Sequence, residues 1–199
     1  IRYFRPPAAN TCALIGTGTQ AKPHLLALAY ELEPDEIRIS GRSAEKVEAL
    51  VAWAIENGLP GQAATTDNAV RGAQVVTTIT SSYEPVFDGE MLEPGALVCA
   101  VGSTKAERQE IDALTVERAG LVVTDSAEGA RTEAGDLIHA ANQRKFDWEE
   151  LVDFKDVVAG RITPPEPGTE IILFESQGVA LQDVVIATLA YKQSMDEQM

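Results

Sequence analysis

The sequence predicts an α/β protein built on a doubly wound, parallel β-sheet. Apolar runs of strand length alternate along the chain with amphipathic stretches of helix length, and this alternation favours parallel strands joined by crossover helices. The middle apolar runs are almost uninterrupted, as expected where helices cover both faces of a sheet. A glycine-rich segment joins the first apolar run to the first amphipathic stretch. A chain of 199 residues is long enough for one such domain with a substantial core.

The predicted elements follow this alternation in order. The first helix follows the glycine-rich segment, and Gly58 and Pro60 end the second. Asp67 is expected to cap a short third helix. We expect the segment 161–168, which contains three prolines, to be a stiff loop rather than a domain linker, because only one strand and one helix follow it. Strands are expected at residues 11–15, 36–40, 62–65, 74–80, 97–101, 121–124 and 170–174, and the longer helices at 19–33, 44–57, 109–119 and 179–194.

Composition and charge argue against several classes of partner. The chain has 31 Asp and Glu but 16 Lys and Arg, a net charge of −15, which disfavours binding to nucleic acid or to an anionic membrane surface. No apolar run approaches the ~18 residues of a membrane span. Cys12 and Cys99 lie in separate apolar runs, so a disulfide framework is not indicated and we expect a cytoplasmic protein. No His, Cys or Asp cluster has metal-ligand spacing, and no metal is expected.

The glycine-rich segment has the pattern of a dinucleotide-binding turn. Residues 16–21 read Gly-Thr-Gly-Thr-Gln-Ala between a predicted strand and a predicted helix, which is the setting of a Rossmann-type phosphate site. Gly16 permits the tight turn, Gly18 leaves space for a pyrophosphate, and Ala21 lets the helix pack closely on the strand. Thr19 and Gln20 complete the turn, and the helix N-terminus would attract the phosphates. The alternative is a glycine-bearing connection in an α/β fold that binds something else.

The end of the second predicted strand favours NADP(H) over NAD(H). An NAD site normally has an acidic residue there, which bonds the ribose hydroxyls, but this chain reads Ser40, Gly41, Arg42 and Ser43. Arg42 can pair with a 2′-phosphate through its planar fork, and both serines can donate hydrogen bonds. The first 50 residues are balanced at six basic and six acidic side chains, which also suits an anionic ligand. NAD(H) stays as the alternative, with Ser43 capping the helix and Arg42 solvated.

Later polar residues are expected to complete the site. Thr80 and Ser81 end the fourth predicted strand, and ligands of doubly wound sheets bind beyond the carboxyl ends of the strands. We therefore place both residues near the ribose and nicotinamide, with ordinary strand-end capping as the alternative. Glu84, Glu133 and Asp136 are interpreted as turn caps rather than as an acid/base set.

Several motifs together resemble those of the ornithine cyclodeaminase/mu-crystallin family. The most specific is Phe-Glu-Ser-Gln-Gly-Val-Ala-Leu-Gln-Asp at residues 174–183. The others are the glycine turn at 16–21, Pro94-Gly95, and the segments 100–103, 124–126 and 133–136. The resemblance covers essentially the whole chain.

The resemblance implies a longer protein than this chain. Members have a two-domain subunit and form a homodimer, and a substrate-binding and dimerisation domain precedes the nucleotide domain. This chain begins about where that nucleotide domain begins, so residues 1–199 are expected to form a Rossmann-type NAD(P)-binding domain without its N-terminal partner. The segment 178–199, with the C-terminal helix, would pack toward the absent domain, through which a homodimer would form. The alternative is that the apolar face of this helix covers its own sheet.

The resemblance also implies imine chemistry. Members either transfer hydride between nicotinamide and the imine carbon of a small imino acid, or use tightly held nicotinamide in a cycle that expels ammonia. The aspartate that relays protons in the cyclodeaminases falls at Thr104, whose hydroxyl is too weak an acid or base for that role. Glu175 stands where a basic residue is common. The residues that the resemblance places in the cofactor site are Val101, Gly102, Ser103, Ser176 and Gln177.

The sequence therefore favours an NADP(H)-dependent oxidoreductase acting on an imino or amino acid, as a ketimine reductase or amino-acid dehydrogenase does. Thr104 is the candidate catalytic residue, through hydrogen bonding; alternatively, residues 104–107 form a helix capping box. Two other functions stay open: an ornithine cyclodeaminase, and a non-catalytic NADP(H)-dependent binding protein for a small ligand. The family's substrate-binding arginines and lysine would precede Ile1. The chain alone is therefore expected to bind NADP(H) without turnover.

Overall fold

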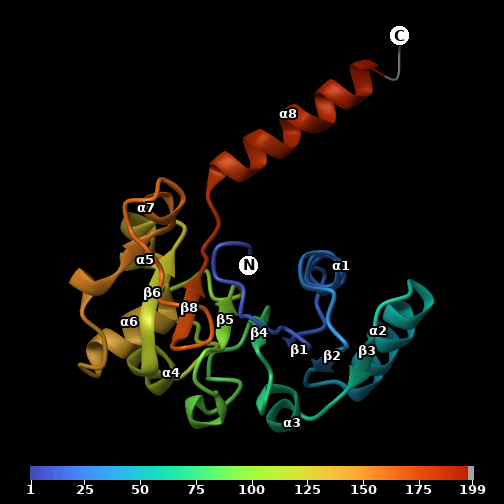
Figure 1. Ribbon diagram of the computed structural model, residues 1–199, viewed down its shortest axis with the longest axis horizontal. Coiled ribbons are helices and arrows are strands. Elements are labelled where there is room, and N and C mark those ends of the chain that lie inside the picture. Colours follow the sequence, from blue (N-terminus) through green and yellow to red (C-terminus); the bar gives the residue numbers. More distant parts are fainter. Residues whose placement is uncertain (197–199) are drawn as a thin grey trace.

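The computed structural model describes residues 1–196 and contains one sheet of eight parallel strands in the order β3-β2-β1-β4-β5-β8-β6-β7 (Figure 1). This arrangement confirms the predicted doubly wound α/β fold of the Rossmann type. The strands are β1 Thr11–Ile15, β2 Glu36–Ser40, β3 Gly61–Ala63, β4 Val75–Thr78, β5 Leu97–Ala100, β6 Ala119–Thr124, β7 Val152–Asp153 and β8 Ile171–Glu175. The helices are α1 Ala21–Leu32, α2 Ala44–Glu56, α3 Thr66–Val70, α4 Ala113–Arg118, α5 Ala127–Glu133, α6 Gly135–Asn142, α7 Phe154–Val158 and α8 Ala180–Asp196, with short 3-10 turns at Gly89–Met91 and Trp148–Glu150.

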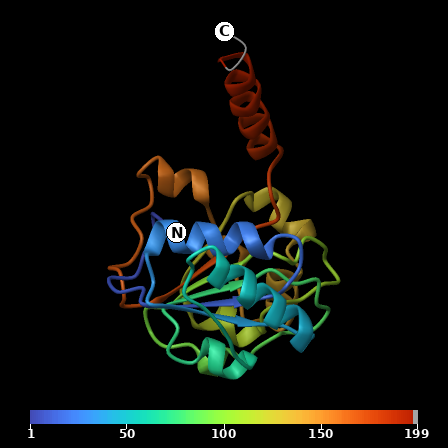
Figure 2. The ribbon, with the colours of Figure 1, turned by 90° about the vertical axis from the view of Figure 1, so that its right-hand side faces the viewer.

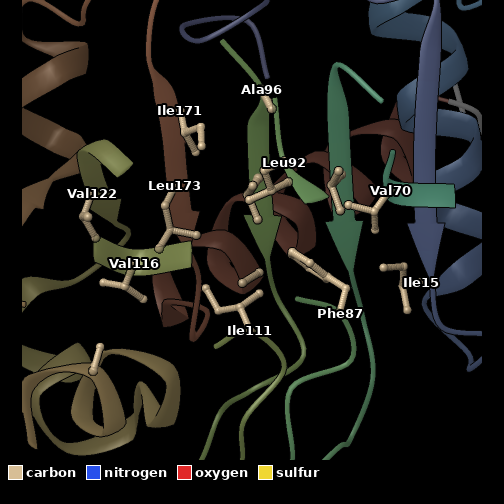
Figure 3. Close-up of a cluster of buried hydrophobic side chains, with 14 of the residues drawn as sticks. Ile15, Val70, Phe87, Leu92, Ala96, Ile111, Val116, Val122, Ile171 and Leu173 are labelled. Carbon is tan, nitrogen blue, oxygen red and sulfur yellow. The ribbon is translucent and has the colours of Figure 1, made fainter. Parts of the chain in front are cut away.

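Two buried clusters, one on each face of the sheet, form the core. Successive residues of β1 point to opposite faces, so Cys12 and Leu14 join the cluster under α1, α2 and α7, whereas Ala13 and Ile15 join the other. Figure 3 shows this second cluster, where Ile15, Val70 and Leu173 pack from three different elements. Helices α3 to α6 contribute to it. Because both faces are covered, the central strands β4 and β5 are buried at every position.

The sheet reverses its strand order between β1 and β4. From β1 the chain builds outward through β2 to β3, then returns so that β4 pairs with the other side of β1. Ile15, the last residue of β1, is in register with Ser40 of β2 and Thr78 of β4. The loops that leave β1 and β4 therefore diverge at their carboxyl ends, which is where open α/β sheets bind ligands.

The strands at 11–15 and 36–40 are confirmed at both bounds, and the others are confirmed within a few residues. Two helix starts differ from expectation. The side chain of Thr65, not Asp67, caps α3 by accepting a hydrogen bond from the Asn68 amide at 3.4 Å. The helix expected at 109–119 begins only at Ala113, because Asp112 caps it by accepting from the Thr115 amide at 2.8 Å.

The sequence patterns missed the elements between β6 and β8. This region contains α5, α6, α7 and the two-residue strand β7, whereas the expected elements included none there. The helices are short, from five to eight residues, so each gives little periodicity to detect. Their stability depends on packing against the sheet, as that of short helices generally does.

Helix α8 projects away from the sheet and its covering helices (Figures 1 and 2). Its apolar side chains face solvent: Leu181 is 69% exposed, Ile186 65% and Leu189 58%. The alternative that this helix covers its own sheet is therefore wrong. No helix within residues 1–196 has both the length and the apolar character needed to cross a membrane.

Candidate functional site: a cleft at the reversal of strand order

A cleft of about 1370 Å³ lies at the carboxyl ends of the strands. It begins at the turn after β1, passes the end of β2, and continues past the loops that follow β4, β5 and β8. Most of the residues expected at the site line it: Gly16, Gly18, Gln20, Gly41, Arg42, Ser43, Thr80, Ser81, Val101, Gly102, Thr104, Ser176 and Gln177. Four do not: Thr19, Ala21, Ser40 and Ser103. Segments more than 150 residues apart in the chain thus share one surface.

The turn after β1 has the geometry of a phosphate site. Gly16 has φ +128°, and a Cβ there would lie 2.8 Å from the Ile79 carbonyl oxygen, so only glycine fits without strain. A Cβ on Gly18 would meet nothing within 4 Å, which leaves the backbone open to a ligand. Ala21, the first residue of α1, is fully buried, and no side chain caps this 12-residue helix at Gln20. In its first turn the Ala21 and His24 amides donate to the carbonyl oxygens of Gly18 and Gln20, and Pro23 has no N–H. The Lys22 amide is therefore the first-turn donor that is available to an anion.

The end of β2 places a cationic side chain on the cleft. Arg42 and Lys46 are both exposed and both line it, and neither forms an ion pair among the side chains of residues 1–195. Ser43 caps α2 by accepting from the Lys46 amide at 3.4 Å. The Ser40 hydroxyl is buried and lies 2.9 Å from that of Thr66, which itself lines the cleft.

A buried carboxyl group organises the loops after β4 and β5. Glu110 accepts hydrogen bonds from the amide of Thr80, from the amide of Gly102 at 2.6 Å and from the hydroxyl of Thr78 at 3.0 Å. A Cβ on Gly102 would collide with the Thr80 carbonyl oxygen, so the two loops lie in direct contact. Glu110 thereby fixes the two segments of backbone that line the cleft beyond the phosphate turn.

A second carboxylate holds the segment after β8. Asp125, which follows β6, accepts from the Ser176 hydroxyl at 2.7 Å, from the Gln177 amide at 3.3 Å and from the Gly178 amide at 2.8 Å. The Gln177 side chain bridges two more groups: it accepts from Thr124 Oγ1 at 3.1 Å and donates to Glu175 Oε1 at 3.2 Å. These bonds fix the last turn before α8.

Glu110, Asp136 and Glu175 are all fully buried. Burial raises the pKa of Glu110 and that of Glu175, the latter well above its usual range and with further help from the negative charges of Asp136, Glu110 and Asp125. Asp136 is not the turn cap that the sequence suggested. It lies in the first turn of α6 and accepts from the amides of Glu110 and Ile111 at 2.7 and 2.9 Å.

The segment that follows β5 differs from expectation in one respect. No helix begins at Thr104, because residues 104–112 contain turns and coil, so the capping-box interpretation is wrong. Thr104 is exposed on the cleft, whereas Ser103 faces the interior and donates to the Arg108 carbonyl oxygen at 3.1 Å. His24 lines the cleft with its Nδ1 2.8 Å from the Gln20 carbonyl oxygen. No group of three potential metal ligands occurs in the described part of the chain.

Sequence reasoning missed the structural role of Glu110, Asp125 and Glu175. Asp125 lies in the family-like segment 124–126, and an acidic residue just after a buried strand could have indicated a role at the strand ends. Glu110 fell inside an expected helix, where nothing distinguished it from a solvated residue. The partners of Glu110 and Asp125 lie 8 to 53 residues away in the chain, so only the fold brings them together. Glu175 bonds Gln177, only two residues away, but its buried neighbour Asp136 is likewise distant in sequence.

The chain matches the ornithine cyclodeaminase/mu-crystallin family over residues 1–198. It belongs to that family. It is 38% identical over 191 residues to the Δ1-pyrroline-2-carboxylate/Δ1-piperideine-2-carboxylate reductase of Azospirillum brasilense, covering 96% of this chain and 58% of that protein. It is 29% identical over 190 residues to the ketimine reductase mu-crystallin of Rattus norvegicus, covering 96% and 57%.

Solved structures of the family agree with this fold. The iminosuccinate reductase of Paracoccus denitrificans, in complex with NAD⁺, is 26% identical and superposes with a TM-score of 0.91 over 99% of this chain and 60% of that one. This chain spans about three fifths of the length of the curated relatives it matches.

Proposed function

We propose that this chain is the dinucleotide-binding part of an NADP(H)-dependent oxidoreductase that interconverts a small imino acid and the corresponding amino acid. The observation that carries the proposal is the shared cleft. It is lined by the glycine turn, by Arg42, which has no ion pair among the described residues, and by the loops at Thr80 and Gly102 that Glu110 holds together. The relatives named above, reductases of cyclic imino acids and a ketimine reductase, support the same reaction class.

The residues of the cleft fit an extended dinucleotide. The uncapped N-terminus of α1 and the open backbone at Gly18 suit the pyrophosphate. Thr80, Ser81 and Gln177 line the cleft toward the strands where a nicotinamide would be held. When bound, the dinucleotide supplies or accepts the hydride, and the protein contributes binding and orientation.

Preference for NADP(H) over NAD(H) rests on charge. No carboxylate ends β2, and Arg42 and Lys46 line the cleft there without ion pairs within the described residues. The other cation nearby in sequence, Arg38, is committed to Glu36 and to the carbonyl oxygens of Asn68 and Arg71. Arg42 is therefore the guanidinium that is available to a 2′-phosphate.

Thr104 favours hydride transfer over cyclodeamination. It lines the cleft at the position that the family resemblance assigns to a proton-relaying aspartate. Its hydroxyl can orient a substrate by hydrogen bonding but cannot exchange a proton efficiently near neutral pH. We propose this positioning role for Thr104.

We further propose that a second domain of the protein covers α8 and forms a homodimer. The apolar residues of α8 are exposed along the whole helix, and the relatives are longer than this chain by a domain-sized segment. A contiguous apolar surface of this kind is typical of an interface. The free, buried thiols of Cys12 and Cys99 suit the reducing cytoplasm that we propose as its location.

Titration of the chain with NADPH and NADH, by calorimetry, tests the proposal. NADPH is expected to bind more tightly than NADH. The chain alone is not expected to oxidise NADPH when a cyclic imino acid is added. Arg42→Ala should weaken NADPH binding about tenfold or more, because a hydrogen bond to a charged group is lost, and should leave NADH binding unchanged. Arg71→Ala, an exposed arginine outside the cleft, is the control. Tighter binding of NADH, or no binding of either dinucleotide, contradicts the proposal.

A further inference from the structure

Three buried carboxyl groups that the proposed reaction does not use lie behind the cleft. Glu110 comes from the segment before α4, Asp136 from the first turn of α6, and Glu175 is the last residue of β8. Each side chain is 0% exposed. Isolated buried carboxylates are strongly disfavoured, so the cluster must satisfy its oxygens by hydrogen bonds or by retained protons.

Counting hydrogen bonds shows where a proton is needed. Both oxygens of Glu110 are used, by two backbone amides and one hydroxyl. Asp136 Oδ1 accepts two amides and Glu175 Oε1 accepts the Gln177 side chain. Within the described residues, the buried carboxyl oxygens that lack a partner are Asp136 Oδ2 and Glu175 Oε2.

The carboxyl groups of Asp136 and Glu175 lie within hydrogen-bonding reach of each other. Two carboxylates repel, whereas a carboxylic acid donates to a carboxylate through a short, strong hydrogen bond. One proton between Glu175 Oε2 and Asp136 Oδ2 gives both orphaned oxygens a partner. Asp136 is the better anion of the two, because two backbone amides donate to its Oδ1, and such donors favour the charged form.

We propose that Glu175 stays protonated at neutral pH, donates a hydrogen bond to Asp136, and acts as a positioning residue for the cofactor by holding Gln177 in the cleft. The inference rests on the proposed function. A single hydrogen bond connects Glu175 to a residue of the cleft: Gln177 Nε2 donates to Glu175 Oε1 at 3.2 Å, and Gln177 lines the cleft. Thr124, which donates to the same amide at 3.1 Å, fixes the other end of the Gln177 side chain.

Loss of this proton has a defined consequence. The titratable groups that face Glu175 are Asp136 on α6, Glu110 before α4 and Asp125 after β6, all acidic, so a second charge at Glu175 would be repelled on every side. Burial raises the pKa of Glu175 well above its usual range. The pKa of Glu175 is higher in the folded chain than in the unfolded one. The contribution of this group to the free energy of unfolding is therefore fully present below the ordinary carboxyl pKa and is lost as pH rises through the folded pKa.

The substitution Glu175→Gln tests the inference, since the amide can still donate to Asp136 but has no proton to lose. Glu170→Gln is the matched control: it makes the same change at an exposed residue just before the other end of β8. Infrared spectroscopy of the free chain should show the band of a buried carboxylic acid in the parent chain and in the control, and a loss of that band in Glu175→Gln. This measurement needs no cofactor.

NADPH titrations across pH complete the test. In the parent chain and the control, affinity should fall as pH rises, whereas Glu175→Gln should bind within about threefold of the parent value at neutral pH and stay level. Asp136→Asn should move the fall to lower pH, since it removes a neighbouring negative charge. An unchanged infrared band in Glu175→Gln, or a pH profile that follows the parent chain, overturns the inference. A chain that loses the band on substitution but binds no dinucleotide at any pH overturns the proposed function instead.

Discussion

The two ends of the cleft are built by different means. At the phosphate turn, one continuous segment supplies the geometry: a glycine with φ +128°, an open backbone at Gly18 and an uncapped helix. At the other end, Thr80, Gly102 and Gln177 come from three separate loops and are held by buried carboxyl groups. Backbone conformation determines the first end, and side-chain hydrogen bonds between distant segments determine the second.

Because of this difference, the two ends of the cleft should be sensitive to different kinds of substitution. A locally encoded turn is harmed by a change within a few residues, which alters the backbone or fills the ligand space. A site tied together by buried carboxyl groups is harmed by removal of one acceptor, because several buried donors lose their partner at once. Variants of each kind should therefore be distinguishable by comparing stability with cofactor affinity.

The largest effect is expected for Glu110→Ala. It leaves the amides of Thr80 and Gly102 and the hydroxyl of Thr78 without acceptors, which should lower the free energy of unfolding by about 3 kcal/mol. Urea unfolding measures this loss. Glu110→Gln, with one acceptor oxygen, should lose less, and Glu107→Ala, at an exposed residue of the same loop, should lose almost nothing. Equal stability of Glu110→Ala and Glu107→Ala would show that the loops are held in another way.

An intermediate effect is expected at the phosphate turn. Gly16→Ala places a Cβ 2.8 Å from the Ile79 carbonyl oxygen at φ +128°, and we expect a loss of about 2 kcal/mol in the free energy of unfolding. Gly18→Ala meets no atom within 4 Å, so it should leave stability unchanged and weaken NADPH binding. If Gly18→Ala binds the dinucleotide as the parent chain does, the pyrophosphate does not approach that turn.

The smallest effect is expected on α8. Replacing Ile186 and Leu189, which are 65% and 58% exposed, by Ser should change the unfolding free energy of the chain by no more than about 0.5 kcal/mol. Leu28→Ala, at a residue that is 1% exposed, should cost about 3 kcal/mol by comparison. In a longer form of the protein that carries the second domain, hydrogen exchange along α8 should slow markedly. Equally fast exchange in both forms would contradict the proposed packing.

The same contrast explains what could be predicted from the sequence. The parallel fold, the strands around the glycine turn and the line of residues from Gly16 to Ser43 follow from local patterns: apolar runs, glycine spacing and a missing acid. Thr80 and Gly102 could be placed at the cleft because strand ends meet at one edge of the sheet. The hydrogen-bonded cluster around Glu175 could not, because a buried acid and a solvated one look alike in sequence.

The position of β8 also has a consequence for how the chain folds. This strand is the last in the sequence, yet it pairs with β5 on one side and with β6 on the other. Until residues 171–175 emerge during synthesis, both of those strands have a free edge, and exposed edges invite association with other chains. Completion of the sheet must wait for contacts between distant segments, which form slowly. Nascent or truncated forms that stop before β8 should consequently depend on chaperones to remain unaggregated.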